Sequence, residues 1–209
     1  MRIYMMKFRY TALFCLLLLP SDVFAGNAFD RVRDNYLALI EKNQYEEALN
    51  IVMPYAESGD DEGQLAVGYI YDVGFKNIPE GMNWYKKSAS QGNAIAQYNL
   101  GNIYYYSVYD YSRAHSYYKN SDKQGYAPST RMLGVLYYFG NGVDRDYRQA
   151  VEYFQRAANA NDAAAQYHLG LCYLESHGVR QDPVKARELL QLAADNGEKR
   201  AADKLNELK

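Results

Sequence analysis

One short pattern recurs along this chain at an almost constant spacing. Three series of residues carry the period, and every series advances in steps of 33 or 36 residues. The series are the small residues Ala48, Gly81, Ala114, Ala150 and Ala186, the glycines Gly68, Gly101, Gly134 and Gly170, and the tyrosines Tyr71, Tyr104, Tyr137 and Tyr173. A period of this length is typical of a solenoid, in which each unit buries its apolar face against its neighbours. The sequence therefore predicts stacked repeats in place of one globular core.

The glycine and tyrosine series belong to the first helix of each unit, called helix A. An apolar residue directly precedes each glycine and lies four residues before the tyrosine, so these two side chains share one helical face. A glycine inside a helix costs about 1 kcal/mol relative to alanine, and its recurrence indicates that two helices approach closely there. We expect helix A at about residues 61–73, 94–106, 128–139 and 163–175.

A second helix, called helix B, follows each helix A. Aspartates suited to cap its start, because a carboxylate accepts hydrogen bonds from free backbone N–H groups, are Asp110, Asp146 and Asp182. Prolines placed in the first turn, where a missing N–H does little harm, are Pro79 and Pro183. Residues predicted to end helix B in the left-handed conformation are Gly92, Gly125, Asn161 and Gly197.

The longer period of the last two units is located in the loop between helix A and helix B. Six residues separate the helix A tyrosine from the helix B cap in the first two units, as in Tyr104 to Asp110. Nine residues separate them in the last two units, as in Tyr137 to Asp146. The three extra residues lie within Gly140–Val143 and Ser176–Val179. Because the helices keep their lengths, we expect the same stacking in all four units.

Both ends of the repeat array depart from the pattern. Residues 26–60 predict an imperfect helix pair, Phe29–Glu41 and Tyr45–Ser58, in which Pro54 kinks or shortens the second helix. Residues 61–197 hold the four full units, and residues 198–209 predict a C-terminal capping helix of the kind that solenoids require. The inner side of this capping helix is predicted to carry Ala202, Leu205 and Leu208.

Residues 1–25 have the features of a secretory signal peptide. Arg2, Lys7 and Arg9 form a basic start, an apolar run covers Thr11–Pro20, and Ala25 provides a small residue for cleavage. The apolar run is well short of the roughly 20 residues that span a bilayer, which favours cleavage over an uncleaved membrane anchor. We expect an exported chain, periplasmic or secreted, with no stable membrane insertion after cleavage.

Composition limits the possible activities of the remaining chain. Cleavage after residue 25 leaves 20 basic and 24 acidic residues, a net charge of −4 with no basic block, which argues against a nucleic-acid partner. Cys172 is then the single cysteine, so no internal disulfide is expected, and a buried, inert thiol is favoured. His115, His168 and His177 lack metal-ligand spacing. The sequence predicts no catalytic, cofactor-binding or metal-binding residues.

Tyrosine is the outstanding residue type, with 23 in the chain. Tyrosine and arginine are enriched at binding hot spots because they offer a large contact area and a polar group. If helix A lines a concave face, the residue three positions before each repeat glycine and those one and four positions after it point inward. The partner-binding residues predicted in this way are Leu65, Tyr69, Tyr98, Asn102, Tyr105, Arg131, Val135, Tyr138, Tyr167 and Leu171. The alternative is that some of them fill gaps between adjacent A helices.

Two motifs of the chain resemble the Sel1-like repeat. They are Ala-Gln-Tyr-x-Leu-Gly-x-x-Tyr at 96–104 and 165–173, and Tyr-Phe-Gly-Asn-Gly-Val-x-x-Asp-x-x-x-Ala at 138–150. The resemblance covers about residues 61–197, although the first two units lack the Gly-x-Gly-Val loop and Ser121-Asp122 replaces the usual pair of small residues. It implies an all-α fold, a right-handed α-solenoid of antiparallel helix pairs that looks like a tetratricopeptide array and binds other proteins.

The resemblance also implies several roles. Bacterial Sel1-like proteins are often exported, and we expect a non-catalytic solenoid that binds another protein or peptide, as an inhibitor or immunity protein against a toxin acting in the periplasm. An envelope assembly factor or signalling adaptor is an alternative, and the oligomeric state stays open. A hydrolase similar to the β-lactamase-linked, cysteine-rich branch is a third reading. The single cysteine of the mature chain argues against it, because that branch carries a disulfide in each repeat.

Overall fold

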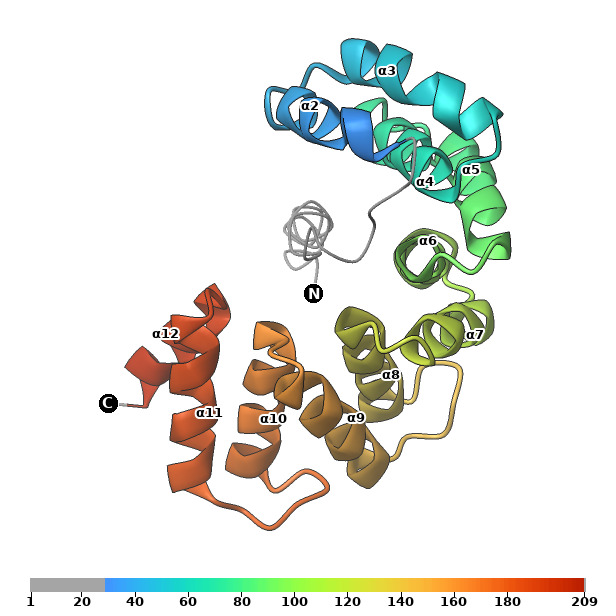
Figure 1. The fold of residues 1–209 in the computed structure, drawn as a ribbon. Coiled ribbons are helices and arrows are strands. Elements are labelled where there is room, and N and C mark those ends of the chain that lie inside the picture. Colours follow the sequence, from blue (N-terminus) through green and yellow to red (C-terminus); the bar gives the residue numbers. More distant parts are fainter. Residues whose placement is uncertain (1–28, 209) are drawn as a thin grey trace. The chain divides into compact units, whose positions relative to one another are not determined.

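The structure is a computed structural model that describes residues 29–208. Within this range the elements are eleven α-helices and two π-helices, without a strand, which confirms the predicted all-α class (Figure 1). The chain divides into two compact units, residues up to Leu100 and residues from Gly101 onward. The predicted signal peptide at residues 1–25 lies outside the described residues.

The helices follow the predicted order of alternating A and B helices. The elements of unit 1 are α2 (Asp30–Glu41), α3 (Tyr45–Glu57), α4 (Asp61–Tyr69), η2 (Ile70–Gly74), α5 (Ile78–Ser90) and the first part of α6 (Ala94–Ile103). Those of unit 2 are the end of α6, η3 (Tyr104–Val108), α7 (Tyr111–Asp122), α8 (Ala127–Phe139), α9 (Tyr147–Asn159), α10 (Ala163–Glu175), α11 (Pro183–Asp195) and α12 (Lys199–Glu207). The predicted A helices correspond to α4 with η2, α6 with η3, α8 and α10.

Three of the A helices, α4, α8 and α10, each pack between two B helices. In unit 1, α4 packs on α3 and α5; in unit 2, α8 packs on α7 and α9, and α10 on α9 and α11. The repeat glycines allow this approach. A Cβ atom on Gly68 would lie 2.6 Å from the Tyr85 ring, and one on Gly134 would lie 2.7 Å from the Phe154 ring. The expected role of these glycines in close helix packing is therefore confirmed.

The predicted helix ends are confirmed. Asp110, Asp146 and Asp182 cap α7, α9 and α11 through hydrogen bonds from backbone N–H groups to their carboxylates. The predicted C-terminal residues all have positive φ angles, 97° at Gly92, 79° at Gly125, 62° at Asn161 and 90° at Gly197. These caps satisfy backbone groups that a helix leaves without internal partners.

A glutamine in the first turn of helix A adds a contact that recurs in three repeats. Its amide donates to a carbonyl at the end of the preceding helix B, over 3.3 to 3.4 Å. The pairs are Gln64 with Ala56, Gln97 with Ala89, and Gln166 with Ala158. Because the last carbonyls of a helix have no partner inside it, the glutamine ties each helix A to the repeat before it.

The third repeat replaces this contact with a polar cluster around Ser121 and Asp122. Ser121 is fully buried, and the Ser129 hydroxyl donates to it over 2.7 Å. Asp122 accepts hydrogen bonds from Thr130 and from the guanidinium of Arg156. Buried polar groups are tolerated when they are hydrogen-bonded, so the pair that departs from the usual small residues packs with its polar groups satisfied.

One expectation for the ends of the chain is wrong. Ala202 is exposed, whereas the buried residues of α12 are Ala201 and the predicted Leu205, and the predicted Leu208 packs against the same cluster. Ala201 and Leu205 are four residues apart and therefore share the helical face that packs against α11. Of the two effects expected of Pro54, shortening is absent, because α3 continues through it to Glu57.

Candidate binding surface

The structure divides the ten residues predicted to bind a partner into two sets of five. The buried set is Leu65, Tyr69, Tyr98, Arg131 and Val135, each less than 9% exposed. The partly exposed set is Asn102, Tyr105, Tyr138, Tyr167 and Leu171, all of which lie in unit 2. The buried side chains fill space between helices, so only the second set offers contact area in the free chain.

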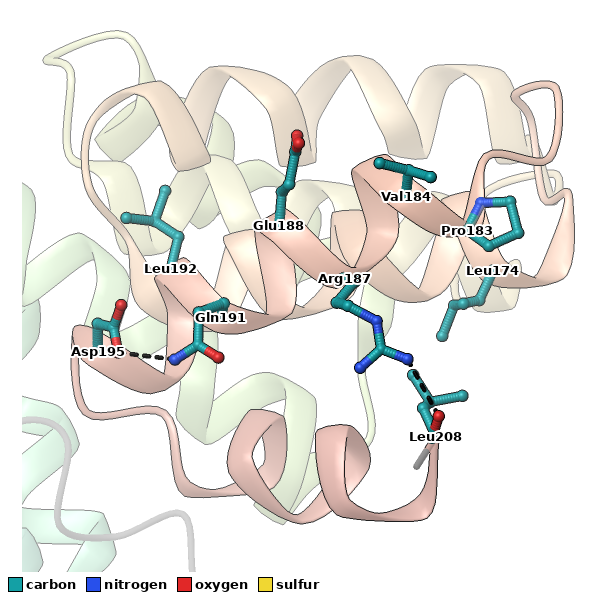
Figure 2. Close-up of a pocket in the computed structure, with 9 residues that line it drawn as sticks. All are labelled: Leu174, Pro183, Val184, Arg187, Glu188, Gln191, Leu192, Asp195 and Leu208. Carbon is teal, nitrogen blue, oxygen red and sulfur yellow. Dashed lines mark hydrogen bonds between the residues drawn. The ribbon is translucent and has the colours of Figure 1, made fainter.

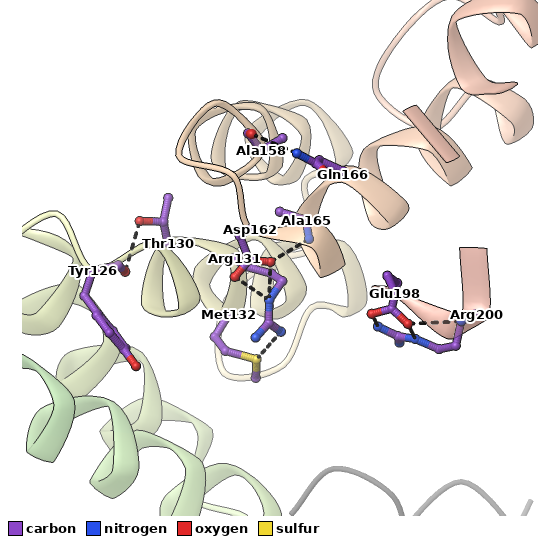
Figure 3. A network of polar contacts seen from close by, with 10 residues as sticks. All are labelled: Tyr126, Thr130, Arg131, Met132, Ala158, Asp162, Ala165, Gln166, Glu198 and Arg200. Carbon is purple, nitrogen blue, oxygen red and sulfur yellow. Dashed lines mark hydrogen bonds and ion pairs between the residues drawn. The ribbon is translucent and has the colours of Figure 1, made fainter. Parts of the chain in front are cut away.

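Arg131 is anchored inside unit 2 by an ion pair. Its Nε lies 3.0 Å from a carboxylate oxygen of Asp162, and both side chains are less than a tenth exposed. Asp162 also caps α10, accepting the backbone N–H of Ala165 over 2.7 Å (Figure 3). Breaking a buried ion pair by removing one partner costs several kcal/mol, about 3 to 5. Arg131 therefore holds α8 to the start of α10.

Tyr167 lies under a second charged pair of unit 2. The guanidinium of Arg200 lies 4.7 Å from the Tyr167 ring centre and 2.7 Å from a carboxylate oxygen of Glu198. Burial alone would raise the pKa of Glu198, but the hydrogen bonds and charge of Arg200 hold it below its usual value. Figure 3 shows this pair beside the Arg131 network. The Arg200 guanidinium thus helps to hold the partly exposed Tyr167 ring in position.

Tyr105 lies near the end of its helix A and contacts the loop of the following repeat. The side-chain amide of Asn141 donates to its hydroxyl over 2.9 Å. The rings of Tyr106 and Tyr111 pack edge-on against it, with centroids at 4.6 and 5.2 Å. Burial raises the pKa of Tyr105 although the Asn141 bond acts the other way. Three neighbouring side chains therefore hold Tyr105, which remains partly exposed.

Tyr138 repeats this arrangement one unit later. Its hydroxyl lies 2.8 Å from Nδ1 of His177, which occupies the loop position that Asn141 occupies in the preceding unit. Its ring packs edge-on against Tyr147, and Tyr147 stacks on His177 with centroids 4.5 Å apart. Burial, followed by the nearby Glu175 carboxylate, raises the pKa of Tyr138. Tyr105 and Tyr138 are therefore equivalent links between successive repeats.

Three exposed aromatic residues follow these two links closely in the sequence, and sequence reasoning missed them. Tyr106 is 38% exposed, Tyr109 58% and Phe139 60%. Tyr106 and Phe139 directly follow Tyr105 and Tyr138, and each ring contacts that of the preceding residue. We call Tyr105, Tyr106, Tyr109, Tyr138 and Phe139 the loop-edge surface. Their position at the end of helix A, just before the A–B loop, is the signal that could have identified them.

Two further titratable groups of unit 2 are the partly buried His168 and the buried Cys172. His168 stacks on Phe154 with centroids 5.1 Å apart, and burial together with Arg200 and Arg131 lowers its pKa to about 3. Cys172 is fully buried, which raises its pKa to about 12 and confirms the expected buried thiol. Among residues 29–208 no group of three His, Cys, Asp or Glu side chains is placed to hold a metal ion, and no helix has the length and apolarity of a membrane span.

Paired helices that repeat with a glycine at each helix crossing define an α-solenoid of stacked repeats, a class built to present side chains to other proteins. The Sel1 repeat matches residues 61–93, 94–126, 127–162 and 163–198. The chain therefore belongs to the Sel1 repeat family, whose members are generally non-catalytic protein-binding scaffolds. This agrees with the resemblance seen in the sequence.

Solved structures support the assignment. A Sel1 repeat protein from Oxalobacter formigenes is 30% identical, with a TM-score of 0.74, over 83% of this chain and 74% of that one. The c5321 protective antigen of uropathogenic Escherichia coli is 31% identical, with a TM-score of 0.65, over 76% of this chain and 37% of the antigen. The immunity protein Pa5087 of Pseudomonas aeruginosa shares the fold, with 18% identity, a TM-score of 0.57, and 90% and 81% of the two chains covered. None of the curated proteins compared with the chain matches it.

Proposed function

We propose that this chain is an exported, non-catalytic binding protein that holds one partner protein through unit 2. The loop-edge surface carries the proposal. Tyr106, Tyr109 and Phe139 expose more than a third of their area, while Tyr105 and Tyr138, whose rings contact those of Tyr106 and Phe139, are held by the next repeat. Aromatic rings that are already immobilised lose little conformational entropy on binding, which is how hot spots gain affinity.

Three partly exposed residues on A helices add to the proposed contact area: Asn102 on α6, and Tyr167 and Leu171 on α10. Tyr167 is positioned by Arg200, so it offers a rigid ring with a cation beside it. Interfaces typically combine such anchors with a polar rim. The buried residues of the predicted set, such as Arg131, support this surface from within and do not need to touch the partner.

Within this class we propose an inhibitor or immunity role against a toxin acting in the periplasm. A chain whose described residues hold repeats alone is suited to sequester one partner. The shared fold of Pa5087 shows only that such helical repeats are compatible with an immunity protein. An assembly or signalling adaptor is the competing role, and a binding assay alone does not separate the two.

Partner capture from envelope extracts tests the binding surface. We expect Tyr106→Ser together with Phe139→Ser to lose the protein that the unaltered chain captures, with unchanged helical circular dichroism. Phe75→Ser is the matched control, because Phe75 in unit 1 is as exposed as Tyr106, at 38%, and directly follows the end of a helix A. Equal capture by all three chains would contradict the proposed surface.

Toxicity of the captured partner tests the role. An immunity protein predicts that the partner, directed to the periplasm without this chain, arrests growth, and that co-expression restores it. A partner that is harmless there favours the adaptor. Export is tested separately, because the mature chain recovered from a periplasmic fraction should begin near Gly26.

A further inference from the structure

Two asparagine–glycine pairs lie in unit 2. They are Asn141-Gly142, in the long loop of the third repeat, and Asn196-Gly197, directly after α11. An asparagine followed by glycine can lose its side-chain amide, because the backbone nitrogen of the glycine can attack the amide carbon and no Cβ atom hinders the approach. Both glycines are exposed, so access of water does not distinguish the two pairs.

The second pair is restrained by the end of a helix. The N–H of Gly197 donates to the Ala194 carbonyl in the last turn of α11, over 2.9 Å. The same turn is tied by Gln191, whose side-chain amide donates to Asp195 over 2.9 Å (Figure 2). The Gly197 nitrogen must therefore give up a hydrogen bond before it can attack the Asn196 side chain.

The glycine of the first pair has no such restraint. In the described part of the chain, the Gly142 N–H makes no hydrogen bond to another protein group. The residue before it is held in place, because the Asn141 N–H donates to the Leu136 carbonyl over 3.0 Å and its side-chain amide donates to the Tyr105 hydroxyl over 2.9 Å. The Gly142 nitrogen can therefore lose its proton without first breaking a hydrogen bond within the chain.

The fold requires a glycine at position 142. Its φ is 70°, and a Cβ atom there would lie 2.7 Å from Cβ of Tyr111 at the start of α7. No side chain that would slow the attack fits at this position, so the reactive pair is built into the loop. The matching loop of the fourth repeat has His177 before Gly178 and carries no amide there.

We propose that Asn141 is a site of spontaneous deamidation in the folded protein and that Asn196 is protected. The Gly142 nitrogen loses its proton to hydroxide and forms a bond to Cγ of Asn141. The bond from Cγ to Nδ2 breaks, and Nδ2 leaves as ammonia with a proton taken from water. A second water molecule opens the resulting succinimide ring at either carbonyl. The products are aspartate or isoaspartate at position 141, each with a new negative charge.

Deamidation changes the link between this loop and Tyr105. The amide of Asn141 is the donor in that link, whereas a carboxylate has no donor. Isoaspartate also lengthens the backbone beside Gly142, where Tyr111 leaves no space. Because Tyr105 belongs to the loop-edge surface, we expect the isoaspartate form to bind the partner more weakly, a consequence that rests on the proposed function.

Peptide mapping by mass spectrometry, after incubation of the purified protein in mildly alkaline buffer, tests the site. We expect conversion at Asn141 to be at least about tenfold faster than at Asn196, because the Gly197 nitrogen first loses a hydrogen bond. In the urea-unfolded chain the two pairs should convert at similar rates, since the structure that separates them is gone. Similar rates in the folded protein, or faster conversion at Asn196, would overturn the proposal.

Asn141→His is the matched variant, because it gives the third repeat the residue that the fourth repeat carries. This variant should show no conversion at position 141 and should keep its own level of partner capture constant during incubation. The unaltered chain should lose capture as isoaspartate accumulates, measured by labelling with an isoaspartyl methyltransferase. Conversion with constant capture would contradict the effect on the loop-edge surface, whereas absence of capture by the fresh protein would contradict the proposed function.

Discussion

The first two repeats and the last two join helix A to helix B differently, yet they arrive at the same contact. In every repeat the backbone N–H of the helix B cap donates to the carbonyl of the helix A tyrosine. The distances are 2.7 Å for Asn77 to Tyr71, 2.9 Å for Asp110 to Tyr104, 2.9 Å for Asp146 to Tyr137 and 3.0 Å for Asp182 to Tyr173. The chain closes this bond over six residues in the first pair and over nine in the second.

The shorter connection is made by widening the end of helix A. Residues Ile70–Gly74 and Tyr104–Val108 form π-helices, with the N–H of Phe75 bonded to the carbonyl of Ile70 five residues earlier. In the longer connection helix A stays α-helical to its end and a left-handed residue stops it, Gly140 or Ser176. The conserved feature is therefore the closing hydrogen bond, and the helix end adapts to the available length.

The largest expected effect concerns the longer loop, where Gly178 has a φ of 73°. A Cβ atom there would lie 2.2 Å from the backbone oxygen of Tyr147, in the preceding helix B. We expect Gly178→Ala to lower the free energy of unfolding in urea by about 4 kcal/mol, as clashes with backbone are among the severest single changes.

Gly92→Ala is the matched control for that change. Gly92 has a φ of 97° with no atom within 4 Å of its ideal Cβ, so only the left-handed strain of about 1 kcal/mol remains. Equal losses for the two variants would mean that the loop moves away easily, and the long connections would then be less rigid than the structure indicates.

The next effect concerns the helix crossing. A Cβ on Gly101, in a short-loop repeat, would lie 2.4 Å from the Tyr118 ring, whose hydroxyl is fixed by Asn102. A Cβ on Gly170, in a long-loop repeat, would meet the flexible Leu190 at 3.0 Å. We expect Gly101→Ala to cost about 3 kcal/mol and Gly170→Ala about 1 kcal/mol in unfolding experiments, because a bonded ring yields less than a leucine. The reverse order would show that Tyr118 is mobile.

Sequence periodicity located the helices because period and capping are local properties. The predicted starts and ends of helices A and B agree with α4 to α11 closely, and Asp110, Asp146 and Asp182 cap as expected. The π-helical ends could not be predicted from the sequence. The connection in the first two repeats is three residues shorter than in the last two, but this length difference does not indicate which part of the backbone changes its conformation.

The candidate site was less accessible to sequence reasoning. Tyr98 and Tyr105 lie seven residues apart on one helix A, so the sequence pattern places them on the same face, but Tyr98 is buried and Tyr105 is partly exposed. The difference depends on which neighbouring elements cover each ring, as with Asn141, which reaches Tyr105 from a loop 36 residues further on. Such coverage is a tertiary property. The exposure of Phe139 was missed for the same reason.

The fourth repeat differs from the other three at one residue, His168, that makes stability depend on pH in the acid range. The position of His168 in the fourth repeat is taken by Ala66, Asn99 and Met132 in the others, so only the fourth repeat holds a titrating group there. The folded pKa of about 3 lies below the ordinary value of 6.5, so the unfolded chain takes up the proton first. The contribution of His168 to the free energy of unfolding is therefore fully present above pH 6.5 and decreases as pH falls toward 3.

We expect His168 to contribute about 2 kcal/mol of stability loss between pH 6.5 and pH 5. His168→Met, the residue of the third repeat, should remove this loss, as measured by urea unfolding at both pH values. The comparison fails if both chains lose the same stability over that interval, since acid sensitivity would then come from groups elsewhere.

The smallest expected effect concerns the links from Tyr105 and Tyr138 to the long loops. Tyr138→Phe removes the hydroxyl that meets His177, and Tyr105→Phe removes the one that meets Asn141. Each change should cost about 1 kcal/mol, the net value of a hydrogen bond, because the rings keep their aromatic contacts. A double-mutant cycle of Tyr105→Phe with Asn141→Ala, read from unfolding free energies, isolates the pair. The first repeat has Asp72 at the matching position, so this link exists only where a long loop follows. A coupling energy near zero in that cycle would mean that the hydrogen bond from Asn141 to the Tyr105 hydroxyl does not help to hold the long loop of the third repeat.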